Sequence, residues 1–157
     1  MAFILGIDPG LCHTGWALLP LKNTPQNATW GCIATNARQP LEQRLVSLFN
    51  QLQSVFKENK PHLVAIEKTL VGRGKPESLT LAGARSISLL VTGLFNLPLF
   101  EYAPTHIKKI MTGSGHATKQ QVIFMVQQAL NTEKKLNSHE ADAVAVALTQ
   151  LYTNQNF

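Results

Sequence analysis

The N-terminal part of the chain alternates short apolar runs with turn residues. The run at residues 3–8 stops at the turn dipeptide Pro9-Gly10, which predicts a buried strand. Residues 15–19 and 28–35 have the same short apolar character, and the loop between them contains Pro20 and Pro25. Three strands in succession predict an antiparallel meander.

After residue 40, the spacing of the apolar positions changes from that of a strand to that of a helix. Apolar side chains recur every three or four positions, beginning at Leu41, Leu45 and Leu48, and Pro61 ends the pattern. The predicted helices cover residues 40–59, 77–96, 104–111, 118–130 and 138–152. The two strands that follow the meander cover residues 63–67 and 99–102.

This order of elements predicts an α/β fold with a mixed five-stranded sheet and helices on both of its faces. The chain has 157 residues, no internal repeat and no linker, so we expect a single domain over residues 1–157. Cys12 and Cys32 lack the spacing of a metal site, and the N-terminal apolar run meets Asp8 too early for a signal peptide. We therefore expect free thiols and a cytoplasmic protein.

Positive charge is concentrated in the middle of the chain. Residues 68–119 contain seven lysines and arginines against two glutamates, which equals the net charge of +5 of the whole chain. Such a stretch suggests a polyanionic partner, although a solvated basic face would have the same composition.

Two carboxylates end predicted strands. Asp8 closes the first apolar strand, and Glu67 closes the strand at residues 63–67. If these strands are neighbours, both carboxylates emerge at one edge of the sheet, where their repulsion favours a bound divalent cation such as Mg²⁺ or Mn²⁺. The alternative for Asp8 is an Asx turn into Pro9-Gly10.

A third acidic cluster begins the last predicted helix. At about 100° per residue, His139 and Asp142 share one face of this helix, whereas Glu140 points away from it. Glu140 has a structural role available, because with Asn137 as N-cap it completes a capping box. Asp142 could instead be a first-turn acid that stabilises the helix dipole, and His139 an ordinary surface residue.

Short motifs over nearly the whole chain together resemble one nuclease family. They are Gly-Ile-Asp-Pro-Gly at residues 6–10, Thr14-Gly15, Ala-Ile-Glu at 65–67, Gly-Ala-Arg at 83–85, Phe-Glu-Tyr-Ala-Pro at 100–104, Val122, and Glu-Ala-Asp-Ala-Val-Ala-Val-Ala at 140–147. In this order they resemble the RuvC family of Holliday-junction resolvases, which are crossover junction endodeoxyribonucleases. The resemblance implies an RNase H-like fold and a DNA nuclease.

The resemblance also implies four active-site positions and two divalent ions per site. Three positions fall on Asp8, Glu67 and Asp142, and the fourth, commonly an aspartate, is His139 here. Asp8 would bridge two Mg²⁺ ions, Glu67 would hold one, and Asp142 with His139 the other; Mn²⁺ would substitute. His139 could instead orient or deprotonate the attacking water. Lys119 or Lys108 would offset charge in the transition state, and the products would carry 5′-phosphate and 3′-hydroxyl ends.

The expected partner is four-way junction DNA. Lys108 and Lys119 match lysines that the RuvC family places near the scissile phosphate. In that family the loop after Glu67 approaches the junction centre. The residues expected to contact DNA are Leu70, Arg73, Lys75, Lys108, Lys109 and Lys119. The family works beside a RuvA–RuvB branch-migration motor, and we expect nucleoid association in a bacterial cell.

A symmetric junction implies a two-fold homodimer. The candidate interface is the helix at residues 77–96, whose apolar stripe could alternatively face its own core. The stripe consists of Leu79, Gly83, Ile87, Leu90, Val91 and Leu94, and the small residues expected to allow close approach are Gly83, Ala82, Ala84 and Ser86.

Three other classes remain as alternatives. A sugar-kinase or actin-like phosphotransferase shares the Gly-Ile-Asp start but needs two such domains. A catalytically silent junction-binding module would not need the complete acidic set. Another RNase H-like nuclease, including one that acts on RNA, would have the same site.

Overall fold

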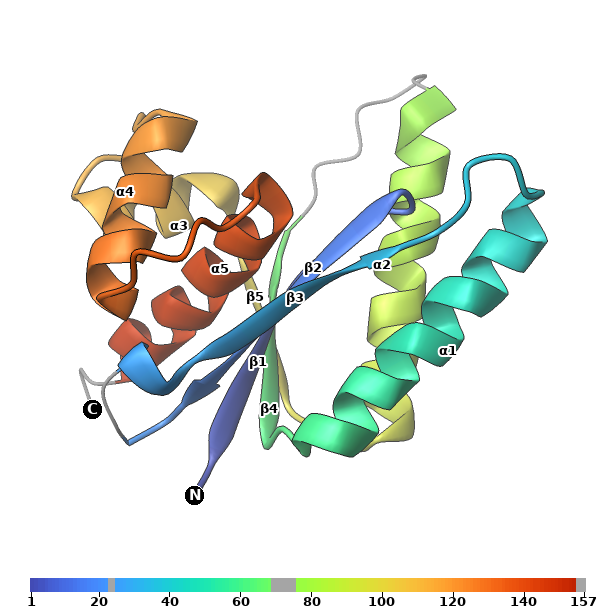
Figure 1. The fold of residues 1–157 in the computed structure, drawn as a ribbon, viewed down its shortest axis with the longest axis horizontal. Helices are drawn as coiled ribbons and strands as arrows, with labels where there is room; N and C mark the ends of the chain where they lie inside the picture. The colour runs from blue at the N-terminus through green and yellow to red at the C-terminus, as the bar shows by residue number, and fades with distance from the viewer. Residues whose placement is uncertain (23–24, 69–75, 155–157) are drawn as a thin grey trace.

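The computed structural model describes residues 1–22, 25–68 and 76–154 of the chain (Figure 1). Its strands are β1 (Phe3–Asp8), β2 (His13–Pro20), β3 (Thr29–Ala34), β4 (Leu63–Glu67) and β5 (Leu99–Tyr102). Its helices are η1 (Pro25–Asn27), α1 (Leu41–Asn59), α2 (Pro76–Leu94), α3 (Pro104–Thr112), α4 (Lys119–Leu130) and α5 (Ser138–Asn154).

The five strands form one mixed sheet in the order β3-β2-β1-β4-β5. β1 pairs with β2, and β2 with β3, in antiparallel fashion, which confirms the predicted meander. β1 pairs with β4, and β4 with β5, in parallel, because helices connect these strands. β1 and β4 are therefore neighbours, with Ile7 opposite Ile66.

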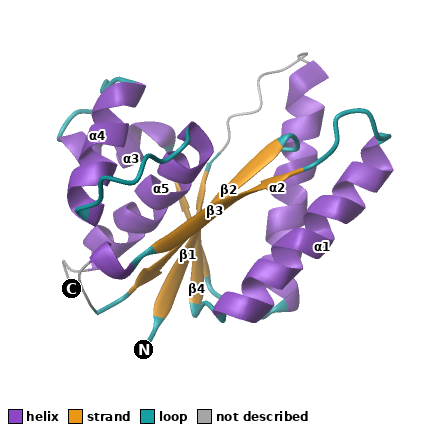
Figure 2. Ribbon diagram, in the orientation of Figure 1, coloured by secondary structure: helices purple, strands orange, loops and turns teal. Residues whose placement is uncertain are grey.

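Helices cover both faces of the sheet, as predicted (Figure 2). α1 and α2 pack on one face over a core that includes Leu5, Ile7 and Phe56. α3, α4 and α5 pack on the other face over a second core that includes Ile4 and Val144. Successive side chains of a strand point to opposite faces, so β1, β2 and β4 each contribute buried residues to both cores. Among the described helices, none has the length and apolar character that a membrane span requires.

α5 lies unusually close to the sheet, and two strand glycines allow this approach. A Cβ atom on Gly6 would lie 2.2 Å from the carbonyl oxygen of Ala143, and one on Gly15 would lie 2.0 Å from that of His139. Both distances are too short for any side chain. A glycine inside a strand often marks such an approach of another backbone. These glycines therefore set the position of the first turns of α5.

The structure differs from the predicted elements in a few places. β2 begins two residues before the predicted 15–19 and includes Pro20, which lies at the end of the strand where its missing N–H costs little. A single 3₁₀ turn, η1, was not predicted, because three residues carry no periodic signal. α1 ends at Asn59, and Lys60 takes a left-handed conformation (φ 46°) before Pro61.

The predicted apolar stripe of α2 divides between two surroundings. Leu79, Leu90 and Leu94 are 71%, 51% and 54% exposed, so they remain available to a partner. The assignment of Val91 to the interface is wrong, because Val91 is fully buried in the chain's own core. The small residues also serve that core: Ala84 is fully buried, and a Cβ on Gly83 would lie 3.3 Å from Leu45 of α1.

Candidate active site

The ends of β1 and β4 bring two carboxylates to one edge of the sheet. Asp8 and Glu67 are the last residues of these parallel neighbours. Strand alternation places Asp8 on the same face as Gly6, and Glu67 on the same face as Ala65. Gly6 faces Ala143 of α5, and Ala65 packs in the core beneath α3, α4 and α5. Both carboxylates therefore face α5.

α5 supplies two more polar side chains to the same place. Nδ1 of His139 lies 3.4 Å from Oδ2 of Asp8. Asp142 lies one turn further along α5, and together with Glu67 it lines a cavity of about 260 Å³. The helical spacing thus correctly predicted that His139 and Asp142 share one face. We call Asp8, Glu67, His139 and Asp142 the carboxylate site.

Glu140 has the capping role that the sequence predicts. Its carboxylate accepts a hydrogen bond from the backbone N–H of Asn137 at 2.9 Å. The side-chain oxygen of Asn137 accepts one in return from the backbone N–H of Glu140 at 2.8 Å. This reciprocal pair is a capping box, and it fixes the start of α5.

Asp8 does not form the Asx turn that was the alternative explanation for its position. The donor for such a turn would be the backbone N–H of Gly10. That N–H instead donates to the hydroxyl of Thr14 at 3.2 Å, and the Thr14 hydroxyl donates to the Gly10 carbonyl at 2.6 Å. The turn is therefore closed by Thr14, and the carboxylate of Asp8 is left for another role.

The pKa values of Asp8 and Glu67 are raised by burial and by neighbouring carboxylates. Burial, together with the charges of Asp142 and Glu67, raises the pKa of Asp8 from 3.8 to about 7, although the charge of Lys119 opposes this shift. Burial and the charge of Asp142 also raise the pKa of Glu67, opposed by Lys119 and Lys108. Three acids held this close are costly to ionise together, and a divalent cation would remove that cost.

The side chains of the carboxylate site fit a hard divalent cation in their chemistry, although their present spacing is not that of a complete metal site. Carboxylate oxygens with one imidazole suit Mg²⁺ or Mn²⁺. Among residues 1–22, 25–68 and 76–154, no three His, Cys, Asp or Glu side chains are grouped tightly enough to hold an ion as they stand. The ammonium of Lys119 lies 3.0 Å from Asp142, and Lys108 is a second cation that borders the cavity.

His139 is held between Asp8 and a second histidine. The ring of His13, at the start of β2, stacks on it with the centroids 5.1 Å apart and the planes inclined by 14°. Burial and the proximity of His13 lower the pKa of His139. A neutral imidazole that donates from Nδ1 to Asp8 keeps a lone pair on Nε2, which is the form that binds a metal ion.

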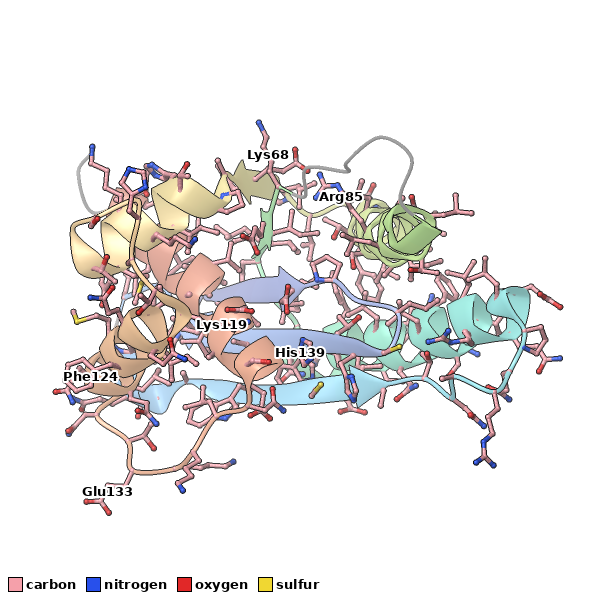
Figure 3. All side chains as sticks on the ribbon, turned by 90° about the horizontal axis from the view of Figure 1, so that it is seen from above. Lys68, Arg85, Lys119, Phe124, Glu133 and His139 are labelled. Atoms are coloured by element: carbon pink, nitrogen blue, oxygen red, sulfur yellow. The ribbon has the colours of Figure 1, made fainter. Side chains whose placement is uncertain are left out.

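The residues predicted to contact DNA divide into three groups. Lys108 and Lys119 line the cavity with Glu67 and Asp142. Lys109 is exposed on α3 and does not line it. Leu70, Arg73 and Lys75 lie outside the described residues. In Figure 3, Lys119 and His139 lie near the centre of the view, whereas Phe124 and Glu133 lie at the periphery.

Arg85 of α2 ties the end of β4 to β5. Its guanidinium donates to the backbone carbonyl of Glu67 at 3.1 Å and forms an ion pair with Glu101. The side chain of Arg85 is only 19% exposed, so this contact is partly shielded from water. Arg85 therefore fixes the backbone that carries Glu67.

Comparisons with known proteins identify the family of this chain. A family model described as "Crossover junction endodeoxyribonuclease RuvC" matches residues 4–150. The chain belongs to the RuvC family. It is 40% identical over 159 aligned positions to the RuvC protein of Wolbachia pipientis subsp. Culex pipiens, covering 100% of this chain and 96% of that one. It is 36% identical to that of Ehrlichia canis, covering 98% and 99%.

A solved RuvC structure has the same fold. The Thermus thermophilus RuvC structure in complex with a Holliday junction substrate superposes with a TM-score of 0.88 at 27% identity, covering 99% of this chain and 97% of that one. The RNase H-like fold and the RuvC resemblance inferred from the motifs are thereby confirmed. As a RuvC protein, the chain is a crossover junction endodeoxyribonuclease of a metal-dependent nuclease family.

Two features of this RuvC site were not found from the sequence. Gly6 and Gly15 carried a usable signal, because glycines inside strands indicate a close backbone approach. The stacking of His13 on His139 carried none, because the two residues are 126 positions apart and belong to different elements.

Proposed function

We propose that this chain resolves four-way DNA junctions by phosphodiester hydrolysis at the carboxylate site. The observation that carries the proposal is the convergence of Asp8, Glu67 and Asp142 at one sheet edge, where the pKa of Asp8 is raised to about 7. The complex of Thermus thermophilus RuvC with a Holliday junction supports four-way junction DNA as the substrate.

Two Mg²⁺ ions per site are proposed as the cofactor, with Mn²⁺ able to substitute. When bound, they activate a water molecule and stabilise the leaving 3′-oxygen. Asp8, Glu67, Asp142 and His139 would hold them. His139 is oriented for this role because Asp8 contacts its Nδ1 and leaves Nε2 as the coordinating nitrogen. Hydrolysis that breaks the bond between phosphorus and the 3′-oxygen leaves 5′-phosphate and 3′-hydroxyl ends.

Lys119 has a second role in the proposal. In the metal-free protein its ammonium pairs with Asp142, and both side chains are partly exposed (53% and 29%), so the pair is weak. Ions that neutralise Asp142 would release Lys119 to the phosphate, where it would offset charge in the transition state. Lys108 borders the same cavity and would contact the same strand. Lys109, Leu70, Arg73 and Lys75 are proposed as further DNA contacts.

A homodimer would match the two-fold symmetry of a junction. The exposed leucines of α2, Leu79, Leu90 and Leu94, are the proposed interface. Each protomer is proposed to be a single nuclease domain over residues 1–157. The RuvA–RuvB motor is proposed as a partner at the nucleoid.

A substrate panel tests this function. The protein is given a mobile synthetic four-way junction, a linear duplex of equal length and an RNA–DNA hybrid, each with Mg²⁺ or Mn²⁺. We expect paired nicks in the junction, products that DNA ligase reseals, and no comparable cutting of the other substrates. Asp8→Asn should bind the junction without cutting it. Preferential cutting of the hybrid would identify another RNase H-like nuclease, and binding without cutting by the wild type would identify a silent binding module.

A further inference from the structure

A second pocket lies beside the carboxylate site and shares His139 with it. This pocket has a volume of about 400 Å³. The turn after β1 contributes Leu11 and Cys12, and β2 contributes His13. The helices α1, α2 and α5 contribute Arg44, Leu81 and His139, respectively. Because His13 stacks on His139, a molecule in this pocket would lie next to the residues that perform the chemistry. We call it the Arg44 pocket.

The guanidinium of Arg44 is held in place by uncharged groups. Its Nε donates to the hydroxyl of Thr35 at 3.1 Å, and its Nη2 lies 3.2 Å from the sulfur of Cys12. Thr35 is itself fixed, since its hydroxyl donates to the carbonyl of Leu11 at 2.5 Å. The turn after β1 and the residue that follows β3 thus orient the guanidinium of Arg44.

Arg44 has no acidic partner among the residues that the structure describes. The ion pairs found there join Arg85 to Glu101 and Lys119 to Asp142, and the remaining acidic contact is that of His139 with Asp8. An arginine that is half-buried, oriented and not neutralised retains N–H donors and a full charge for an external anion. The planar fork of a guanidinium matches the oxygens of a phosphate.

We propose that the Arg44 pocket binds a backbone phosphodiester of the cleaved strand adjacent to the scissile phosphate, with Arg44 as its charged contact. The inference rests on the proposed function, because the anion at this edge is then DNA. One phosphate at the carboxylate site and a neighbouring one on Arg44 would fix the direction of the strand across His139. Arg44 is thus a positioning residue for the cleavage reaction.

The test measures how junction binding depends on salt. Binding of a labelled four-way junction is followed by fluorescence anisotropy in EDTA, which prevents cleavage, over about 50–200 mM NaCl. Wild type, Arg44→Gln, Arg44→Lys and Lys57→Gln are compared. Lys57→Gln is the matched control, because Lys57 lies on the same helix, in its last turn, about 20 Å along the axis.

We expect Arg44→Gln to weaken junction binding roughly tenfold and to reduce the salt slope by about 0.9 for each protomer engaged. Arg44→Lys should keep the slope, because it keeps the charge. Lys57→Gln should match the wild type. Thermal melting of each variant separates binding from folding, and a role in folding alone would leave the slope unchanged.

An Arg44→Gln protein with the wild-type salt slope overturns the Arg44 pocket, whatever its melting temperature. If that protein also cuts junctions, the proposed function stands without the pocket. A wild-type protein that does not bind four-way junctions overturns the proposed function and the pocket together.

Discussion

Asp8 lies close to two further carboxylates, Glu67 and Asp142, which line one cavity. The side chain of Asp8 is only 19% exposed and faces Asp142 and Glu67, so its ionised form is costly. Lys119 offsets part of this repulsion, but as an exposed ammonium it does so weakly. Without a bound cation, the protein therefore carries an electrostatic cost at the residues that we propose as catalytic.

This cost predicts how the stability of the metal-free protein depends on pH. The pKa of Asp8 is about 7 in the folded protein, against 3.8 for an unperturbed aspartate. Between these values the folded state binds a proton that the unfolded state has released, so the free energy of unfolding falls as pH rises through this interval. Above pH 7, Asp8→Asn should be more stable than the wild type by on the order of a few kcal/mol.

Thermal melting in EDTA at both ends of this interval measures the effect. Glu133→Gln is the matched control, since Glu133 is an exposed carboxylate in the loop between α4 and α5 (Figure 3). Equal pH dependence for the wild type and Asp8→Asn would contradict a buried, repelled carboxylate. Added Mg²⁺ should stabilise the wild type and leave Asp8→Asn little changed.

His139 predicts a preference between metal ions. Imidazole nitrogen suits Mn²⁺ at least as well as Mg²⁺, whereas a carboxylate suits both. The ratio of cleavage rates in Mn²⁺ and Mg²⁺ should therefore be higher for the wild type than for His139→Asp. Single-turnover cleavage of the same junction measures both ratios, and equal ratios would exclude His139 as a ligand that selects the ion.

At the scale of elements, the position of α5 decides whether the site exists. β1 and β4 bring Asp8 and Glu67 to one edge, but His139 and Asp142 join them only because α5 lies against Gly6 and Gly15. The capping box of Asn137 and Glu140 fixes the first turn of α5. Backbone contacts thus fix the position of α5 relative to the strands that carry the site.

This dependence on close packing predicts the effect of one methyl group. A Cβ on Gly15 would lie 2.0 Å from the carbonyl oxygen of His139, which is backbone and cannot rotate away. Gly15→Ala should lower stability by roughly 1–3 kcal/mol or more and displace His139, so that junction cleavage is lost. In Gly115→Ala, by contrast, the nearest atom lies at an ordinary 3.4 Å.

Urea unfolding and junction cleavage test both glycine variants. Gly115→Ala should remain within about 0.5 kcal/mol of the wild type and cut normally. A Gly15→Ala protein with wild-type stability and activity would show that α5 does not depend on this contact.

The sequence predicted the elements more completely than their contacts. Period and turn residues located every strand and long helix, and the face shared by His139 and Asp142 followed from helical geometry alone. The sequence pattern did not predict which side of α2 is buried, because leucine and valine occur equally well in a core and in an interface. The Arg44 pocket was missed because its parts come from distant segments whose meeting depends on the tertiary fold.

At the scale of the molecule, the face of α2 that carries Leu79, Leu90 and Leu94 is the strongest candidate for self-association. These three leucines are more than half exposed, whereas Val91 on the same helix is buried. Exposed apolar side chains grouped on one helix mark an interaction surface more often than isolated ones do. A dimer through α2 would place two carboxylate sites on one assembly.

Leu90→Glu should therefore dissociate the proposed dimer, because it places a charge in an apolar contact. Light scattering coupled to gel filtration gives the mass of each variant. Phe124→Glu is the matched control, since Phe124 is 57% exposed but lies on α4, on the opposite face of the sheet (Figure 3). A Leu90→Glu protein that remains dimeric would assign the interface to another surface.

The proposed chemistry requires Asp8, Glu67 and Asp142 to close around divalent ions. Anomalous scattering from Mn²⁺ soaked into crystals of the protein would locate such ions. We predict two anomalous peaks within coordination distance of these carboxylates, with His139 contacting one of them, and their loss in Asp8→Asn. A wild-type map without a peak among the three carboxylates, recorded with Mn²⁺ in excess, would rule out metal binding at this site.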